Sequence, residues 1–266
     1  ELTYSGEGKP ATVTASSDWQ GPAASGITIS YIKSGTYIQQ LENGALPTNA
    51  GTYTASITLG GKEVSVQYTI NKADLTVTAN PATITYGDTA VSNGVTYSGF
   101  VNGEDESVLG GELTYTFSYT PGMDVGNFII TPAGKTSGNY DITFAHGTLT
   151  VEQRTVTLTW HNYENRTYGD GKYVYATAGN LLEADVGKVQ VMVRGNGANA
   201  TGTFTATAFA LSGYRAHNYT LPTTGRTQEY TIGRAEQTLT FAKTGDQSLT
   251  YGETLANPAT NNRADG

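Results

Sequence analysis

The sequence predicts an all-β chain built from tandem β-sandwich repeats. One segment, at residues 75–88, returns twice further along the chain at a nearly constant interval. The composition is rich in Gly and Tyr, which suits turns and pleated strand surfaces. Apolar and polar residues alternate over short runs between Gly, Asn and Pro, as in half-buried strands. Together these observations favour sandwiches in which each sheet buries one face.

The period is clearest at a recurring tyrosine. The segment LTVTANPATITYGD at residues 75–88 returns at residues 156–170 and 239–253, and a looser copy, LTYSG, opens the chain. The tyrosines lie 82, 82 and 83 residues apart, at Tyr4, Tyr86, Tyr168 and Tyr251. A fixed period indicates an array of similar units.

The period divides the chain into four segments, which we call repeats 1 to 4. Repeat 1 spans residues 1–73, repeat 2 spans 74–152 and repeat 3 spans 153–235. Repeat 4, residues 236–266, is the truncated start of a further unit. We expect the 266 residues to be part of a longer protein, because the chain starts inside a strand pattern and ends in ANPATNNRADG, so that both ends look like cuts.

Charge and composition exclude several classes of function. The formal net charge is −8, which disfavours a nucleic-acid partner because such a partner requires a basic face. The chain has no Cys, so it has neither disulfides nor a thiol nucleophile. The chain has no apolar run long enough to predict a membrane-spanning segment, so we expect no membrane insertion. We expect a monomer.

The strand pattern is well defined in repeat 1. Tyr53, Ala55 and Ile57 alternate with polar residues, and Gly60-Gly61 then predicts a tight hairpin, since glycine tolerates positive φ at both central positions. Residues 12–15 suggest one more short strand. Residues 71–74 form a very short linker to repeat 2. Short linkers limit the relative swing of neighbouring repeats, which predicts an elongated, semi-rigid array.

One loop leaves the fold of a single repeat open. Residues 97–109 of repeat 2 could hold a helical turn, with an acidic cluster at Glu104, Asp105 and Glu106. We expect this cluster to be a solvated loop that caps the turn. If the turn packs across a sheet, the unit would be β-grasp-like, and this is the alternative to the sandwich.

Motifs of repeat 2 carry a family resemblance. They are Tyr86-Gly87-Asp88, SGFVNGED at 98–105, DVGNF at 124–128, GNY at 138–140 and GTLTV at 147–151. The segment resembles the MBG domain (mostly β, glycine-rich, YGX type) of large bacterial surface proteins. Repeat 3 shares the Tyr-Gly-Asp turn and the Asn-Tyr pair but departs at residues 181–184, and repeat 4 shares only Tyr251-Gly252-Glu253.

Repeat 1 resembles a second kind of unit. Its segments NAGTY at 49–53 and YTINKA at 68–73 are similar to the Ig-like repeats of bacterial surface proteins. The two resemblances imply Ig-like sandwiches in an extracellular, adhesin-like protein of the bacterial cell surface or cell wall. They imply no catalytic residues, no cofactor and a role as a stalk or spacer that presents other domains. The alternative is a module that binds host or polysaccharide glycans, or surface proteins, through loop aromatics.

The candidate chemistry is sparse. His161 and Glu164 could supply two metal ligands, but a defined site needs three or four, so we expect no metal. The glycine-rich run at 195–200 imitates a dinucleotide fingerprint, yet it lies between two strand patterns and predicts a hairpin turn. No nucleophile, base and acid can be nominated together. We therefore expect no enzyme.

The two tryptophans are the candidate ligand-binding residues. Exposed aromatic rings stack on sugars, so Trp19 and Trp160 are the side chains to examine for glycan binding. Trp160 is in phase with Val156 and Leu158, which favours packing in the interior or between repeats. Trp19 lies in a loop between Asp18 and Gln20.

Overall fold

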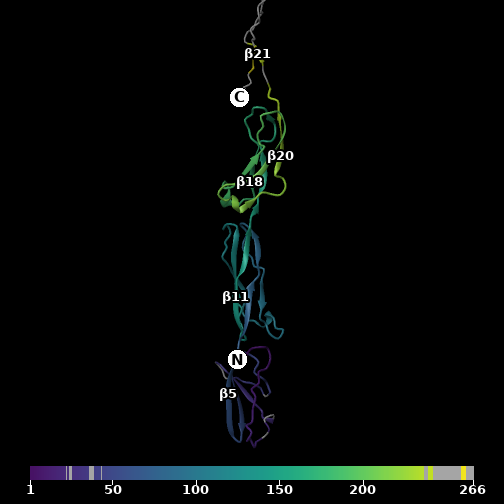
Figure 1. Cartoon of the computed structure of the whole chain (residues 1–266). Helices are drawn as coiled ribbons and strands as arrows, with labels where there is room; N and C mark the ends of the chain where they lie inside the picture. The colour runs from purple at the N-terminus through teal and green to yellow at the C-terminus, as the bar shows by residue number, and fades with distance from the viewer. Residues whose placement is uncertain are drawn as a thin grey trace, which may run out of the picture. The chain divides into compact units, whose positions relative to one another are not determined.

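The computed structural model describes residues 1–21, 23, 26–35, 39–42, 44–236, 239–241 and 259–261. Its regular structure consists of β-strands and short 3-10 turns, so the all-β prediction is confirmed (Figure 1). The chain forms two compact units, residues 1–152 and 153–266. Repeats 1 and 2 share the first unit, and repeat 3 lies in the second.

Repeat 1 contains one five-stranded sheet. Its order is β1 (Leu2–Thr3), β5 (Lys62–Asn71), β4 (Gly51–Leu59), β2 (Ser30–Ser34) and β3 (Gln39–Gln40). The predicted hairpin is confirmed, because β4 and β5 pair antiparallel around Gly60 and Gly61, whose φ angles are 57° and 77°. The strand predicted at residues 12–15 is wrong, since this segment has no regular structure.

Repeat 2 is a sandwich of two sheets. One sheet runs β7 (Ala82–Thr85), β12 (Gly147–Glu152), β10 (Gly126–Ala133) and β9 (Thr114–Phe117). The other runs β11 (Tyr140–Ala145), β6 (Ala73–Ala79) and β8 (Val95–Ser98). Alternate residues of β6 are buried, which places its apolar side against the first sheet.

The loop after β8 forms a single 3-10 turn. This turn, η2 (Glu106–Val108), is capped by Asp105, whose side chain accepts a hydrogen bond from the backbone N–H of Ser107 at 2.9 Å. The predicted capped turn is confirmed. A β-grasp unit would need a helix across a sheet, and within the described part of repeat 2 the only helical residues are these three.

Repeat 3 has a four-stranded sheet like that of repeat 2, but two separate strand pairs take the place of the three-stranded sheet. The four-stranded sheet runs β15 (Arg166–Thr167), β20 (Thr227–Gly233), β18 (Gly202–Ser212) and β17 (Gln190–Arg194). The two pairs are β14 (Thr157–His161) with β16 (Tyr175–Gly179), and β13 (Arg154–Thr155) with β19 (Tyr219–Thr220). Two 3-10 turns, η3 (Glu183–Asp185) and η4 (Ala216–Asn218), complete the repeat.

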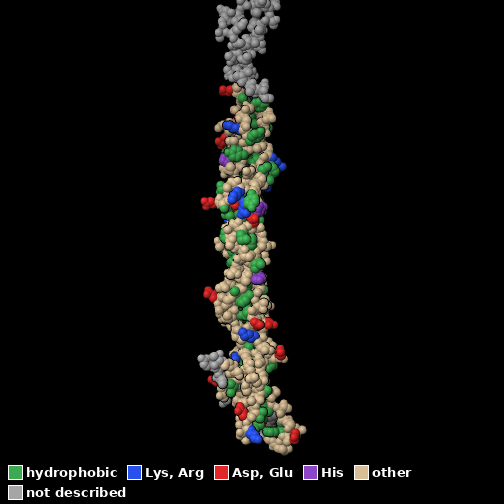
Figure 2. Space-filling model, turned by 90° about the vertical axis from the view of Figure 1, so that its left-hand side faces the viewer, with side chains coloured by type: hydrophobic (Ala, Val, Ile, Leu, Met, Phe, Trp, Pro, Cys, Tyr) green, Lys and Arg blue, Asp and Glu red, His purple; other side chains and the backbone are tan. Residues whose placement is uncertain are grey.

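Repeat 4 contributes two short paired strands, β21 (Leu239–Phe241) and β22 (Ala259–Asn261). Its predicted Tyr251-Gly252-Glu253 motif lies outside the described residues. No helix found in the described residues is long and apolar enough to span a membrane. On the face drawn in Figure 2, the charged side chains are scattered among uncharged ones.

The recurring tyrosine has the same backbone role in repeats 1, 2 and 3. In each, a short strand runs parallel to the last strand of the repeat and ends one residue before this tyrosine. The tyrosine N–H then donates to the end of that last strand: Tyr4 to Asn71 O at 2.8 Å, Tyr86 to Glu152 O at 2.8 Å and Tyr168 to Gly233 O at 2.9 Å. The tyrosine is followed by a turn, where Gly87 and Gly169 take positive φ.

Candidate functional site: the seam between repeats 1 and 2

A seam between repeats 1 and 2 lies within the first compact unit. Strand β5 ends at Asn71 and β6 begins at Ala73, so Lys72 alone separates them. The Lys72 Nζ donates to Ser137 O at 2.8 Å, and the Ala73 N–H donates to Asn139 O at 2.9 Å. Lys72 and Ala73, at the junction of the two strands, are therefore both hydrogen-bonded to the segment 137–139 of repeat 2.

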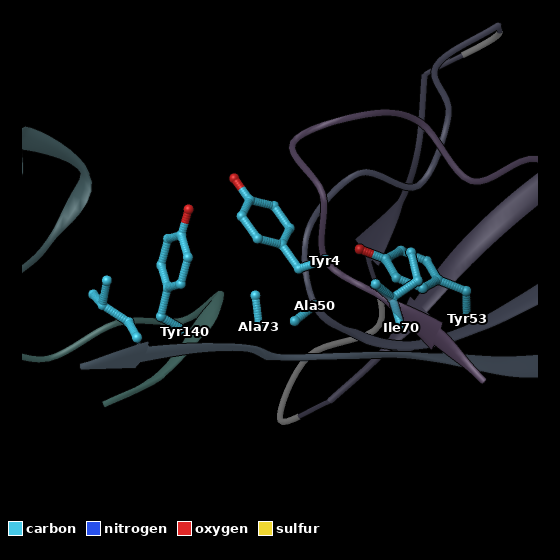
Figure 3. Close-up of a cluster of buried hydrophobic side chains, with 7 residues drawn as sticks. Tyr4, Ala50, Tyr53, Ile70, Ala73 and Tyr140 are labelled. Atoms are coloured by element: carbon cyan, nitrogen blue, oxygen red, sulfur yellow. The ribbon is translucent and has the colours of Figure 1, made fainter. Parts of the chain in front are cut away.

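A single apolar cluster crosses the seam (Figure 3). The rings of Tyr4 from repeat 1 and Tyr140 from repeat 2 meet edge to face, with centroids 5.4 Å apart. The ring of Phe100 also packs edge to face with that of Tyr140, with centroids 5.5 Å apart. The buried members are Tyr4, Ala50, Tyr53, Ile70, Ala73, Leu75 and Tyr140. Burial of tyrosine rings from both sides makes the two repeats share a core.

Glu104 links the two tyrosines through their hydroxyl groups. The Tyr4 hydroxyl donates to Glu104 Oε1, and the Tyr140 hydroxyl donates to Glu104 Oε2. Figure 3 shows both hydroxyl groups pointing the same way out of the cluster. The Tyr140 oxygen also accepts from the Val101 N–H at 3.0 Å. The prediction of a solvated Glu104 is wrong, because its two carboxylate oxygens bind tyrosines of different repeats.

The environment at the seam raises the pKa of both tyrosine hydroxyl groups. Burial, followed by the hydrogen bond to Glu104, raises the pKa of Tyr4 to about 12. Burial and then Glu104 also raise the pKa of Tyr140 above its ordinary value. Both hydroxyl groups therefore stay protonated at neutral pH and remain hydrogen-bond donors to the carboxylate.

Asn139 forms a second polar link across the seam. Its Oδ1 accepts from the Ala50 N–H at 3.0 Å, and its Nδ2 donates to Asn49 Oδ1 at 3.0 Å. Asn139 belongs to the GNY motif of repeat 2, whereas Asn49 and Ala50 belong to the NAGTY motif of repeat 1. The motifs that carried the resemblance therefore meet one another at this seam.

Repeat 3 has a counterpart of the Glu104 arrangement. The Tyr219 hydroxyl accepts from the Leu182 N–H at 3.0 Å and donates to Asp185 Oδ2 at 2.8 Å. The Asp185 Oδ1 accepts from Arg215 Nε at 3.1 Å. Asp185 is 2% exposed, so its carboxylate depends on these partners. An acid three residues after the Val101 or Leu182 position thus recurs beside the core tyrosine.

Repeat 3 also contains an ion pair at its Tyr-Gly-Asp turn. Arg166, 5% exposed, donates from Nε to Asp170 Oδ2 at 2.7 Å and from a terminal nitrogen to Oδ1 at 2.9 Å. This bidentate pair holds the pKa of Asp170 well below its usual range. This pair was not predicted from the sequence, although Arg166 and Asp170 carry opposite charges four residues apart.

The structure places the two predicted ligand-binding tryptophans in different compact units. Trp19 is 41% exposed in a loop of repeat 1, where its backbone N–H donates to Ser16 O at 3.1 Å. Trp160 is half-buried, packs on the interior cluster of repeat 3, and donates from Nε1 to Gly225 O at 3.4 Å. The predicted inward packing of Trp160 is confirmed.

Two other candidates find structural explanations. His161 stacks on Tyr175 at 4.7 Å and shares a hydrogen bond with Thr177. Within the described ranges, no group of three or more His, Cys, Asp or Glu side chains could hold a metal ion. The glycine-rich run at 195–200 joins the antiparallel strands β17 and β18, as predicted for a hairpin connection.

Residues 75–150 match the family model of the MBG domain (YGX type), which confirms the resemblance for repeat 2. No curated protein matches the chain.

Solved structures of tandem Ig domains give weak matches. The N-terminal four Ig domains of Dscam1 match with a TM-score of 0.27 and 13% identity, over 47% of this chain and 37% of that one. A three-domain I-band fragment of titin gives 0.25 and 10%, over 80% and 89%. Drosophila OTK extracellular domains 3–5 give 0.24 and 11%, over 89% and 94%. The chain thus spans little more than a third of the Dscam1 structure, and at these scores nothing about partners follows.

Proposed function

We propose that the chain is a non-catalytic repeat region of an adhesin-like protein on the bacterial cell surface or cell wall. In this proposal it acts, as a monomer, as a stalk that presents other domains. The observation that supports the proposal is the seam, where repeats 1 and 2 share a buried cluster and the Glu104 carboxylate binds a tyrosine of each.

A stalk must resist bending between its repeats, and the seam provides that resistance. Rotation about Lys72 would pull the Tyr4 hydroxyl from Glu104 and Asn49 from Asn139. Each of these hydrogen bonds, when it is exchanged for bonds to water, contributes about 0.5–1.5 kcal/mol. Bending would also expose apolar ring surface, at about 25 cal/mol per Å². Because these costs add to one another, we expect the first unit to hold one arrangement.

The test is a distance distribution between spin labels on the two repeats. The chain has no Cys, so Glu63→Cys in β5 and Thr148→Cys in β12 would introduce unique label sites at exposed positions. We expect a single narrow distribution by double electron–electron resonance. The matched control inserts Gly-Ser-Gly after Lys72 and should give a broad distribution. A distribution in the original chain as broad as that of the control would reject a stiff stalk.

A second candidate function is glycan binding, and the exposure of Trp19 favours it. Trp19 is 41% exposed, and an exposed indole is a side chain on which a sugar ring could stack. Trp160 is the weaker candidate because it is packed on the interior cluster of repeat 3. Binding of the intact chain to a glycan array and to immobilised mucin tests this function. Saturable binding that Trp19→Ala abolishes, in a variant with an unchanged melting temperature, would support it; no binding would reject it.

A further inference from the structure

Two tyrosines of different repeats share one carboxylate at the seam. The Tyr4 and Tyr140 hydroxyls each donate to a different oxygen of Glu104. Their rings meet edge to face, with centroids 5.4 Å apart. Both side chains are buried, at 5% and 1% exposed, so close packing holds the rings in this arrangement. Two phenol rings fixed this close to each other form a pair that oxidation can join.

The carboxylate supplies the base that oxidation of a phenol needs. A tyrosine that gives up an electron also gives up its phenolic proton, because the radical cation is a strong acid. The Tyr4 and Tyr140 hydroxyls are protonated at neutral pH, so each proton must pass to a base within hydrogen-bond reach, and Glu104 is that base. Glu104 is partly exposed and can pass the proton on to water. An oxidant that reaches Glu104 is therefore one side chain away from both phenols.

We propose that Tyr4 and Tyr140 are a site of oxidative cross-linking, which a peroxidase with hydrogen peroxide joins into a dityrosine. Each tyrosine loses one electron to the oxidant and one proton through Glu104 to water. The two neutral radicals couple by a carbon–carbon bond between the ring carbons beside the hydroxyl groups. The hydrogen on each of these carbons moves to the phenol oxygen, which restores both aromatic rings. The pair loses two hydrogen atoms, and one hydrogen peroxide is reduced to two waters.

A second tyrosine pair shows why the carboxylate matters. Tyr53 and Tyr68 of repeat 1 stack with centroids 6.0 Å apart. Their hydroxyls donate to backbone carbonyls, of Asn49 and Lys9, at 2.8 Å each. A backbone carbonyl accepts a hydrogen bond but is too weak a base to take the proton. We therefore expect this pair to cross-link far less, although its rings are almost as close.

Repeat 3 has the base but a different second partner. The Tyr219 hydroxyl donates to Asp185 Oδ2 at 2.8 Å, which resembles the bonds to Glu104. The other oxygen of Asp185 accepts from Arg215, a side chain that does not couple to a tyrosyl radical. The seam between repeats 1 and 2 combines the two requirements, a shared base and a neighbouring phenol ring.

A bond between Tyr4 and Tyr140 would join repeats 1 and 2 covalently. Rotation at Lys72 that separates the two rings would then require a covalent bond to break. The proposal does not rest on the stalk function, because the reaction needs only the geometry of the seam. In a stalk, the bond would make this joint between repeats permanent.

The test treats the intact chain with a peroxidase and limiting hydrogen peroxide. Cross-links in the monomeric fraction are then mapped by digestion and tandem mass spectrometry. We expect a linked pair of peptides that contain Tyr4 and Tyr140, two hydrogen atoms lighter than the separate peptides together. Its yield should exceed that of a link between Tyr53 and Tyr68 by about tenfold or more.

Matched variants test the role of each group. Tyr4→Phe should abolish the link, and Glu104→Gln, which cannot take the proton, should lower its yield by about tenfold or more. Tyr214→Phe, at a position that is 81% exposed, is the control and should leave the link unchanged.

The map of the unaltered chain tests the site even if a variant fails to fold. The proposal is overturned if links between other tyrosines predominate in the monomer, or if folded Glu104→Gln forms the link in the original yield. It is also overturned if no link forms while N-acetyltyrosine in the same reaction is oxidised.

Discussion

The loops of repeats 2 and 3 both bind the hydroxyl group of a core tyrosine, but their acidic residues have different second partners. In both, a loop N–H, of Val101 or Leu182, donates to the hydroxyl of a buried core tyrosine. In both, an acid three residues later accepts from that hydroxyl. The acid's other oxygen differs: Glu104 binds the neutral Tyr4 of repeat 1, whereas Asp185 binds the charged Arg215 of its own repeat.

This difference shows how one loop position takes on two tasks. The bond between acid and core tyrosine anchors the loop to the interior of its repeat in both cases. The remaining carboxylate oxygen is then available for a second contact, and the longer Glu at position 104 reaches into the preceding repeat. Glu104 is therefore one of the residues that join repeats 1 and 2, whereas Asp185 makes its second contact within its own repeat.

The largest effect is expected for Asp185→Ala. The substitution leaves the Tyr219 hydroxyl and the Arg215 guanidinium without the buried carboxylate. Breaking a buried pair in this way costs about 3–5 kcal/mol. Urea unfolding followed by the fluorescence of Trp160, in a Trp19→Phe background, should show this loss. The control is the exposed Glu183→Ala; equal stability of the two variants would contradict a supporting role for Asp185.

Glu104→Ala should destabilise the first unit by a smaller amount. The site is only partly buried, and water can reach the two tyrosine hydroxyls once the carboxylate is gone. We expect a loss of about 2 kcal/mol, measured by urea unfolding and the fluorescence of Trp19 in a Trp160→Phe background. Glu104→Gln should lose less, because its oxygen still accepts one hydrogen bond. Glu112→Gln is the exposed control, and a loss there as large as in Glu104→Ala would mean that charge alone matters.

Asn139→Ala should cost about 1–2 kcal/mol in the same assay. It removes the acceptor for the Ala50 N–H and the donor to Asn49 but leaves the aromatic cluster in place. Asn127→Ala, at an exposed position of β10, provides the comparison within the same repeat. If the two asparagine variants were equally stable, the polar link would contribute nothing to the seam.

The smallest effects are expected from changes in pH. The stability of the first unit should fall at alkaline pH, and that of the second unit should fall at acid pH. Tyr4 has its pKa raised from 10.0 to about 12, so its contribution is complete below pH 10 and is lost as pH rises toward 12. Asp170 has its pKa lowered from 3.8, so its contribution to the second unit is complete above about pH 4 and is lost on further acidification.

Unfolding curves at pH 9–12 and pH 2–5 test this contrast. Tyr4→Phe should flatten the alkaline decline of the first unit, and Asp170→Asn should flatten the acid decline of the second. An alkaline decline that is unchanged in Tyr4→Phe would show that other tyrosines, such as Tyr68 with its pKa raised to about 12, dominate.

Much of the architecture was predictable from the sequence because it depends on local patterns. The alternation of apolar and polar residues predicted which residues of β6 face inward, and Gly60-Gly61 predicted the hairpin of β4 and β5. The seam was not predictable, since Tyr4 and Glu104 are 100 residues apart and only the fold brings them together. Asn139 shows the same limit: its motif was recognised, but its partners at Asn49 and Ala50 depend on how two repeats meet.

The most direct test of the account is amide hydrogen exchange on the intact chain with Glu104→Ala and the control Glu112→Gln. Glu104 belongs to repeat 2, so a merely local role would speed exchange there alone. We predict faster exchange in Glu104→Ala also at the Tyr4 amide and in β1 and the end of β5 in repeat 1, with no change in the control. Exchange in repeat 1 that stays at the original rate would contradict a carboxylate that joins the two repeats.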